Sequence, residues 1–443
     1  LNGDWKFNWV PNPEERPKDF YKTEFDVSGW DNIPVPSSWN IYGIQKDGTQ
    51  KYGTPIYVNQ PVIFQHKVAV DDWRGGVMRT PPSNWTTFKA RNEVGSYRRE
   101  FTIPEDWDGK EIFINFDGVD SFFYLWINGQ YVGFSKNSRN TASFNITKYL
   151  VKGTNVVAVE VYRSSDGSFL EAQDMFRLPG IYRTVALQAV PQLHVRDLVV
   201  TPDLDATYTD GELKINADIR NLGKKAAKGY SMVYSLYANQ LYSDDNTEVN
   251  NAGISTPVAV VEAGQEVTAE TILKVQKPNK WSAEKPYLYT LVEIKDTPAS
   301  EDEFGLAGRY YYVNGKTVKL KGVNRHETNP GVGHAITRKM MENEIMMMKR
   351  ANINHVRNSH YPDDHEYYYG KASLSHPIEW KNAHVARVME MVHANINNPS
   401  IVIWSLGNEA GPGQNFVAAY DALKVADKSR PVQYERNNDI VDM

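Results

Sequence analysis

From about residue 312 the sequence alternates between short apolar runs and amphipathic stretches. The runs predicted as strands are VKLKGVNRH (318–326), INHVRNSH (353–360), SIVIWSLGNE (400–409) and PVQYE (431–435), and helices are predicted at 337–352, 376–398 and 415–427. Apolar strands that alternate with helices are typical of a parallel α/β fold, and a (β/α)8 barrel fits the pattern. Because only about four strands are visible, residues 312–443 are predicted to form part of such a barrel.

The first 190 residues have a different pattern, in which short runs of β-branched and aromatic residues repeat without a helical period. The main runs are 97–103, 111–117, 122–128 and 155–163. Between two strands lies Asn128-Gly129, a strong hairpin signal because both positions of a tight two-residue turn need positive φ. These features predict a β sandwich or jelly roll over residues 1–190.

A second β-rich region follows at residues 191–300. Strands are expected at 214–222, 230–238, 257–263, 267–275 and 287–296. Their number and spacing suit an immunoglobulin-like sandwich of roughly 100 residues. The chain is therefore predicted to hold three domains.

Two places break the expected order of elements. After the strand at 353–360, two helical stretches follow where a parallel fold should return a strand. Either the connection is atypical or residues are absent between Tyr369 and Gly370, and the stretch 298–311 also has the look of a broken junction. The stretch 71–95 has no clear period and is predicted to be a long loop.

Composition excludes several classes of function. The chain has no cysteine, which removes disulfides, thiolate metal sites and a cysteine nucleophile. Its net charge of −5 argues against nucleic acid or an anionic membrane as partner. No apolar run approaches the roughly 20 residues of a membrane helix, so a soluble protein is expected. The methionines at 340, 341 and 346–348 have helical spacing and are interpreted as core residues rather than a soft-metal site.

Polar clusters end three of the predicted barrel strands, at 324–327, 357–360 and 408–409. The carboxyl ends of barrel strands form one rim, where active sites lie, so these clusters are expected to converge. Glu409 is the strongest candidate, because an apolar strand raises the pKa of a carboxyl, as a general acid near neutral pH requires. The alternative from the residues alone is an ion pair of Glu409 with Arg325 or Arg357.

Several motifs together resemble the bacterial β-galactosidases of glycoside hydrolase family 2. They are LNGDWKF, IPVPSSW, DGVDSFFYLWING, EAQDMFRLPGIYR, GVNRHE, VRNSHYP, WSLGNEAG and RPVQYE, in the order of the family and over nearly the whole chain. The resemblance implies a jelly-roll sugar-binding domain, an immunoglobulin-like sandwich and part of a TIM barrel. It also implies a retaining glycosidase that acts on terminal β-D-galactosides.

The resemblance assigns roles to particular residues. Glu409 would be the general acid/base and a ligand of Mg²⁺, and Arg357 would support the rim. Asp174 would hold the sugar and help to bind Na⁺. The other residues expected to contact galactose are Asn59, His326, His360 and Asn408.

The resemblance also implies what these 443 residues lack. A retaining mechanism needs a second carboxyl about 5 Å from the first, and the family's nucleophile and its Glu-x-His pair of Mg²⁺ ligands are not present. Glu435 ends a predicted strand and can be nominated as nucleophile, although the family does not use that position. The chain as given is therefore not expected to hydrolyse glycosides alone.

Other readings of the chain stay open. One is a β-glucuronidase or β-mannosidase on the same scaffold, and another is a carbohydrate-binding remnant without catalysis. A homo-oligomer is expected from the resemblance, and a cytoplasmic location, with a periplasmic one after loss of a signal peptide as the alternative.

Overall fold

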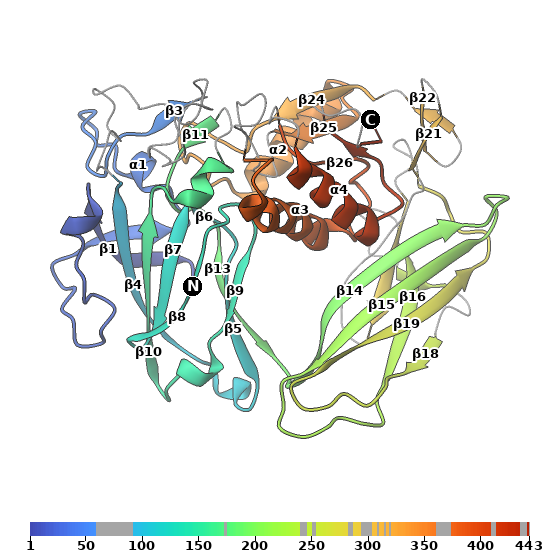
Figure 1. Cartoon of the computed structure of the whole chain (residues 1–443), viewed down its shortest axis with the longest axis horizontal. Coiled ribbons are helices and arrows are strands. Elements are labelled where there is room, and N and C mark those ends of the chain that lie inside the picture. The colour runs from blue at the N-terminus through green and yellow to red at the C-terminus, as the bar shows by residue number, and fades with distance from the viewer. Residues whose placement is uncertain are drawn as a thin grey trace.

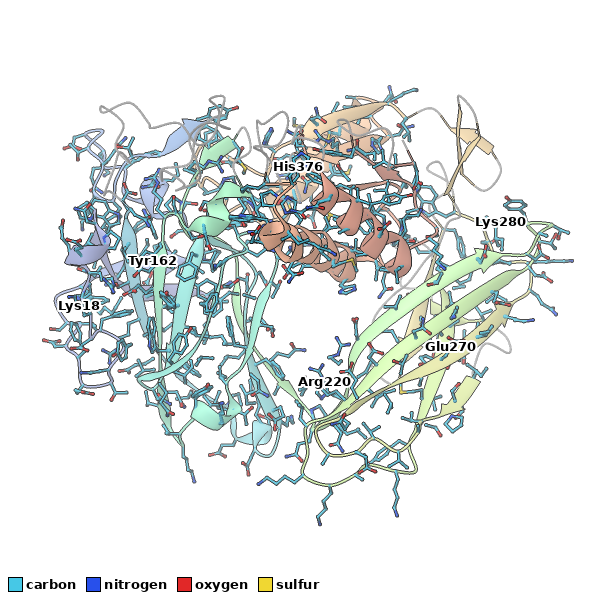
Figure 2. The ribbon with its side chains drawn as sticks, viewed as in Figure 1. Lys18, Tyr162, Arg220, Glu270, Lys280 and His376 are labelled. Atoms are coloured by element: carbon cyan, nitrogen blue, oxygen red, sulfur yellow. The ribbon has the colours of Figure 1, made fainter. Side chains whose placement is uncertain are left out.

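The computed structural model describes most of the chain. The described residues are 1–58, 92–171, 175–239, 246–249, 254–281, 287–293, 304–307, 310–313, 316–318, 320–359, 374–408, 413–434 and 441–442. They form a β sandwich, a second β sandwich and a mixed α/β part, in this order along the chain (Figure 1). Figure 2 shows Tyr162 on the first sandwich, Glu270 on the second and His376 beside the helices of the α/β part.

The N-terminal part is a jelly-roll sandwich. One sheet has the order β2-β1-β4-β10-β7-β8, and the order β13-β5-β9 forms a second sheet. The strands of these two sheets are β1 (Gly3–Val10), β2 (Asp31–Val35), β4 (Val94–Thr102), β5 (Glu111–Phe116), β7 (Phe122–Ile127), β8 (Gln130–Ser135), β9 (Ala142–Asn145), β10 (Thr154–Tyr162) and β13 (Val185–Val190). Alternate residues of β5 and β7 are buried, and they meet in one aromatic and aliphatic core.

Shorter elements complete this sandwich. They are α1 (Trp39–Tyr42), β3 (Ile56–Val58), β6 (Val119–Asp120), β11 (Met175–Arg177) and β12 (Gly180–Ile181), with β3 paired to β11 and β6 to β12. The predicted hairpin between β7 and β8 is confirmed, since Asn128 has φ 50° and Gly129 has φ 78°. Most of the predicted loop 71–95 lies outside the described residues.

The second part is the predicted immunoglobulin-like sandwich. Its strands are β14 (Leu193–Leu204), β15 (Gly211–Asn221), β16 (Ser231–Asn239), β17 (Asn246–Glu248), β18 (Ile254–Pro257), β19 (Glu266–Val275) and β20 (Leu288–Glu293). One sheet has the order β14-β15-β19, and in the other β16 pairs with β17, β18 and β20. The strand expected at 257–263 is wrong, because β18 ends at Pro257 and Val261 makes only an isolated bridge with Ala227.

The α/β part follows a small antiparallel sheet of β21 (Phe304–Ala307), β22 (Tyr310–Val313) and β23 (Lys316–Val318). Its elements are β24 (Gly322–Arg325), α2 (Arg338–Arg350), β25 (His355–Asn358), α3 (Lys381–Asn395), β26 (Trp404–Ser405), α4 (Gln414–Ala426) and β27 (Val432–Gln433). Two pairs are parallel, β24 with β25 and β26 with β27. The described strands form no closed barrel, and the part is therefore a partial TIM barrel.

The best-packed region of the partial barrel lies between α3, α4 and the β26–β27 pair. Phe416 and Tyr434 are fully buried there, and their rings stack with centroids 4.6 Å apart. None of the helices in the described ranges combines the length and apolar character needed to cross a lipid bilayer.

Helix α2 differs from the prediction for its methionines. It has no buried residue, and the side chains of Met346 and Met347 are 47% and 66% exposed. The interpretation as core residues is therefore wrong for this pair. The physical reason is that the described strands form only two separate pairs, which leave an apolar face of α2 uncovered.

Candidate active site

The first two predicted polar clusters lie side by side at the carboxyl ends of β24 and β25. In the parallel register Asn324 is opposite Arg357, and Arg325 is opposite Asn358. Beyond the strands, the backbone N–H of Ser359 donates to the carbonyl of Arg325 at 2.8 Å. The strand ends therefore share one rim, as parallel strands of a barrel require.

The third cluster reaches the same rim through a hydrogen bond. Nη2 of Arg357 donates to Oδ1 of Asn408, which follows β26, at 2.8 Å. Asn408 is only 5% exposed. A buried amide oxygen needs such a donor, because leaving it unpaired costs about 1–3 kcal/mol. Residues 51 positions apart in sequence are thus held together at the rim.

Glu327 connects this rim to the jelly roll and was not singled out as a site residue from sequence. Its carboxylate accepts from Nη1 of Arg325 at 3.1 Å, from Nη2 of Arg183 at 2.9 Å and from Nδ2 of Asn358 at 3.4 Å. Burial raises the pKa of Glu327, but the charges of Arg183 and Arg325 outweigh it and hold the pKa below its ordinary value. Glu327 is therefore an ionised anchor between domains, and its only sequence signal is its place in NRHE.

Arg325 has a further partner besides these. Arg325 also bonds Glu344 of α2, at 2.8 Å from Nε and 2.7 Å from Nη2. The alternative ion pair of Glu409 with Arg325 or Arg357 stays a prediction, because Glu409 lies outside the described residues.

On the jelly-roll side, the pairing of β3 with β11 brings together the neighbours in sequence of two predicted sugar-binding residues, Asn59 and Asp174. Val58, which directly precedes Asn59, is the register partner of Met175, which directly follows Asp174. The pairing is antiparallel, so the end of β3 and the start of β11 lie at the same end of this two-stranded sheet. Asn59 and Asp174 themselves lie outside the described residues.

Of the remaining predicted site residues, some are described by the structure and others are not. His326 directly follows β24 and is exposed at the rim. His360, Glu409 and Glu435 lie outside the described residues, so their predicted roles stay predictions.

His334, which has no sequence signal, is buried between the two domains. It is 2% exposed, with Nδ1 3.0 Å from the carbonyl oxygen of Glu327 and Nε2 3.3 Å from that of Phe176 in β11. Burial, aided by the charges of Arg139 and Arg183, lowers the pKa of His334 to about 3. The ring is therefore neutral and carries a single N–H, which can donate to one of these two carbonyl oxygens.

The metal sites implied by the resemblance have little support among the described side chains. No group of three His, Asp or Glu side chains in the described ranges is arranged to hold a metal ion. The two nominated ligands, Glu409 and Asp174, both lie outside these ranges. The predicted Mg²⁺ and Na⁺ sites therefore stay predictions.

Family models match almost the whole chain. The model of the glycosyl hydrolases family 2 sugar binding domain matches residues 1–191, and one described as glycosyl hydrolases family 2 matches residues 193–306. The model of the family's TIM barrel domain matches in two parts, residues 305–370 and 369–443.

Two curated relatives, both named beta-galactosidase, are similar over nearly all of the chain. The protein of Priestia megaterium is 38% identical over 475 residues, which cover 98% of this chain and 43% of the relative. The protein of Vibrio vulnificus (strain YJ016) is 37% identical over 473 residues, which cover 98% of this chain and 42% of the relative. The chain thus spans less than half the length of these relatives.

Solved structures show the same fold at lower identity. A beta-glucuronidase from glycoside hydrolase family 2 is 21% identical with a TM-score of 0.76, covering 100% of this chain and 47% of that one. The beta-glucuronidase of Bacteroides uniformis is 22% identical with a TM-score of 0.71, covering 98% and 51%. With all three family models matched in order, the chain belongs to family 2 of the glycosyl hydrolases.

Proposed function

We propose that this chain is part of a retaining β-galactosidase that hydrolyses terminal non-reducing β-D-galactosides, with Glu409 as general acid/base. The observation that carries the proposal is the hydrogen bond from Arg357 to Asn408, the residue directly before Glu409. That bond ties the end of β26 to the rim formed by β24 and β25. Asn408, the residue directly before Glu409, is thus held at the rim where barrel active sites lie.

In the proposed reaction Glu409 first donates a proton to the leaving glycosidic oxygen. A second carboxylate attacks the anomeric carbon, and the galactosyl ester is then hydrolysed by water that Glu409 deprotonates. Asn408 binds the sugar's 2-hydroxyl, and His326, His360, Asn59 and Asp174 hold galactose. Because the chain covers less than half of its relatives, the second carboxylate is proposed to belong to the part of the protein outside these 443 residues.

One observation favours galactose over glucuronic acid. The relatives at 34–38% identity are named beta-galactosidase, whereas beta-glucuronidase structures are only 17–22% identical.

Mg²⁺ and Na⁺ are proposed as cofactors on the resemblance alone, with Glu409 and Asp174 among their ligands. No step above depends on either ion. Dialysis against a chelator for Mg²⁺ in a sodium-free buffer, followed by addition of each ion separately, tests this part by the change in hydrolysis rate.

The function is tested by azide rescue of a Glu409→Ala variant of the complete encoded protein. The wild type is expected to hydrolyse p-nitrophenyl β-galactoside and to leave the β-glucuronide and β-mannoside nearly untouched. The variant should lose about 10²–10⁴-fold in rate. Azide needs no general base, so it should restore turnover and give β-galactosyl azide with retained configuration.

Two results would contradict the proposal. Unchanged activity in the variant would remove Glu409 from catalysis, and preferred hydrolysis of the glucuronide would reverse the choice of substrate. Sugar binding without turnover in the complete protein would favour the non-catalytic alternative.

A further inference from the structure

A buried ion pair joins the barrel helix α3 to the jelly roll. Nη2 of Arg387 lies 3.1 Å from Oε1 of Glu171, and the two side chains are 8% and 7% exposed. The same carboxylate accepts the backbone N–H of Ser138 at 3.1 Å and its Oγ–H at 2.5 Å. The pair joins residues 216 positions apart and is held in one geometry by its other bonds.

The position of Glu171 in the sequence gives this pair its importance. Glu171 directly precedes residues 172–174, and Asp174, proposed above to hold the sugar, is the last of them. Met175 directly follows and is paired with Val58. Arg387 therefore acts on the residue at which the chain enters this segment.

The other flank of the segment is also contacted from the barrel. The carbonyl oxygen of Phe176 faces Nε2 of His334 at 3.3 Å. Gly333, which directly precedes His334, has φ +64°. A Cβ at this position would lie 2.9 Å from Leu178 and 3.1 Å from Ile41. Two separate barrel elements thus approach the two ends of one short jelly-roll segment.

The jelly roll is shaped to admit Arg387. A Cβ on Gly167 would lie 2.9 Å from the carbonyl oxygen of Lys136 and 3.3 Å from Nη2 of Arg387. Nη2 of Arg387 also lies 3.4 Å from that carbonyl oxygen. Glycine at this position lets the guanidinium lie against the jelly-roll backbone.

The energetics of such a pair favour a role in geometry. Desolvating two charges offsets most of their attraction, so a buried ion pair adds little net stability, while breaking it is costly. In some proteins such a pair selects one arrangement of the groups it joins. Here the groups joined are the jelly roll and the barrel helix α3.

We propose that Arg387 is a positioning residue that, through Glu171, fixes the jelly-roll strand β11 relative to the barrel rim. This inference rests on the proposed function, because Asp174, the residue directly before β11, is proposed there to hold the sugar. The pair lies on the sugar-binding side and not at the reacting carboxyl, so its loss is expected to weaken substrate binding more than it slows the chemical step.

The kinetic test compares Arg387→Met with Asn397→Ala in the complete encoded protein. Asn397 follows the same helix but bonds β14 of the immunoglobulin-like sandwich, through Leu198 and Val200. KM for p-nitrophenyl β-galactoside should rise about 10-fold in Arg387→Met, with a smaller change in kcat, because small misplacements of binding groups are costly. KM should stay within about twofold in Asn397→Ala, and Arg387→Lys should recover part of the loss.

A second readout does not need activity. Hydrogen exchange of the complete encoded protein should become faster at residues 175–178 in Arg387→Met and stay unchanged there in Asn397→Ala. If Arg387→Met does not fold, Glu171→Gln and Arg387→Lys keep the shape of the pair, and both should show the same change in exchange more weakly.

The outcomes separate the two proposals. A wild type without β-galactosidase activity would remove the proposed function, and the exchange data would still judge the positioning. Unchanged exchange at 175–178, or an equal rise of KM in Asn397→Ala, would overturn the role of Arg387.

Discussion

His384 should make the packing of α3 on α4 sensitive to mild acid. The residue is 1% exposed, its Nδ1 lies 2.9 Å from the carbonyl oxygen of Trp380, and its ring meets that of Phe416 edge-on at 5.4 Å. Burial lowers the pKa of His384 from 6.5 to about 4; the hydrogen bond to Trp380 opposes this, and the charge of Arg387 adds to it. The informative substitution is His384→Phe, which keeps a ring against Phe416 and cannot titrate.

The direction in which stability changes with pH follows from proton binding by His384 in the folded and unfolded states. Below pH 6.5 the unfolded chain takes up a proton that the folded ring refuses, so stability falls as pH falls until the folded pKa is reached. Between pH 7.5 and pH 5.0 this amounts to about 2 kcal/mol. The phenylalanine loses the hydrogen bond to Trp380, worth about 1 kcal/mol. The variant should therefore be about 1 kcal/mol less stable at pH 7.5 and about 1 kcal/mol more stable at pH 5.0.

Hydrogen exchange of the α3 and α4 amides measures this locally in a chain of several domains. After correction for intrinsic rates, protection should fall from pH 7.5 to pH 5.0 by a factor about 30 times larger in the wild type than in the variant. Other groups that titrate in this range are common to both proteins and cancel. A variant that is less protected by the same factor at both pH values would refute the reasoning.

Three further substitutions test other contacts. Asp427→Ala should lower the free energy of unfolding by about 3 kcal/mol, because Nε1 of Trp404 loses its buried acceptor at 2.7 Å. Urea unfolding monitored by tryptophan fluorescence measures this, and a cost under about 1 kcal/mol would contradict it. Asn397→Ala should cost about 2 kcal/mol, since its amide makes two hydrogen bonds to β14; exchange of β14 amides measures it, and unchanged exchange would count against it. Gly333→Ala should lower the melting temperature, because φ is +64° and the site is crowded, whereas the matched Gly331→Ala, with only a 3.4 Å neighbour, should not; equal melting temperatures in both would refute the argument.

Much of the fold follows from local features of the sequence. The alternation in FFYLWI predicts a strand with one buried face, and β7 buries every second residue. Asn128-Gly129 predicts the tight turn after it, and both residues have positive φ. The methionines of α2 show the limit of such reasoning, because a helical period marks an apolar face without telling whether another element covers it.

For the candidate site, the sequence alone determined which strands end in polar residues and, with the barrel pattern, that those ends share a rim. Only the tertiary structure decided which side chains meet there and between domains: Arg357 with Asn408, Arg183 with Glu327, and Arg387 with Glu171. The last two pairs join residues 144 and 216 positions apart. Periodicity and turn chemistry act over a few neighbouring residues, whereas such pairs depend on how whole domains pack, and no local pattern in the sequence encodes that.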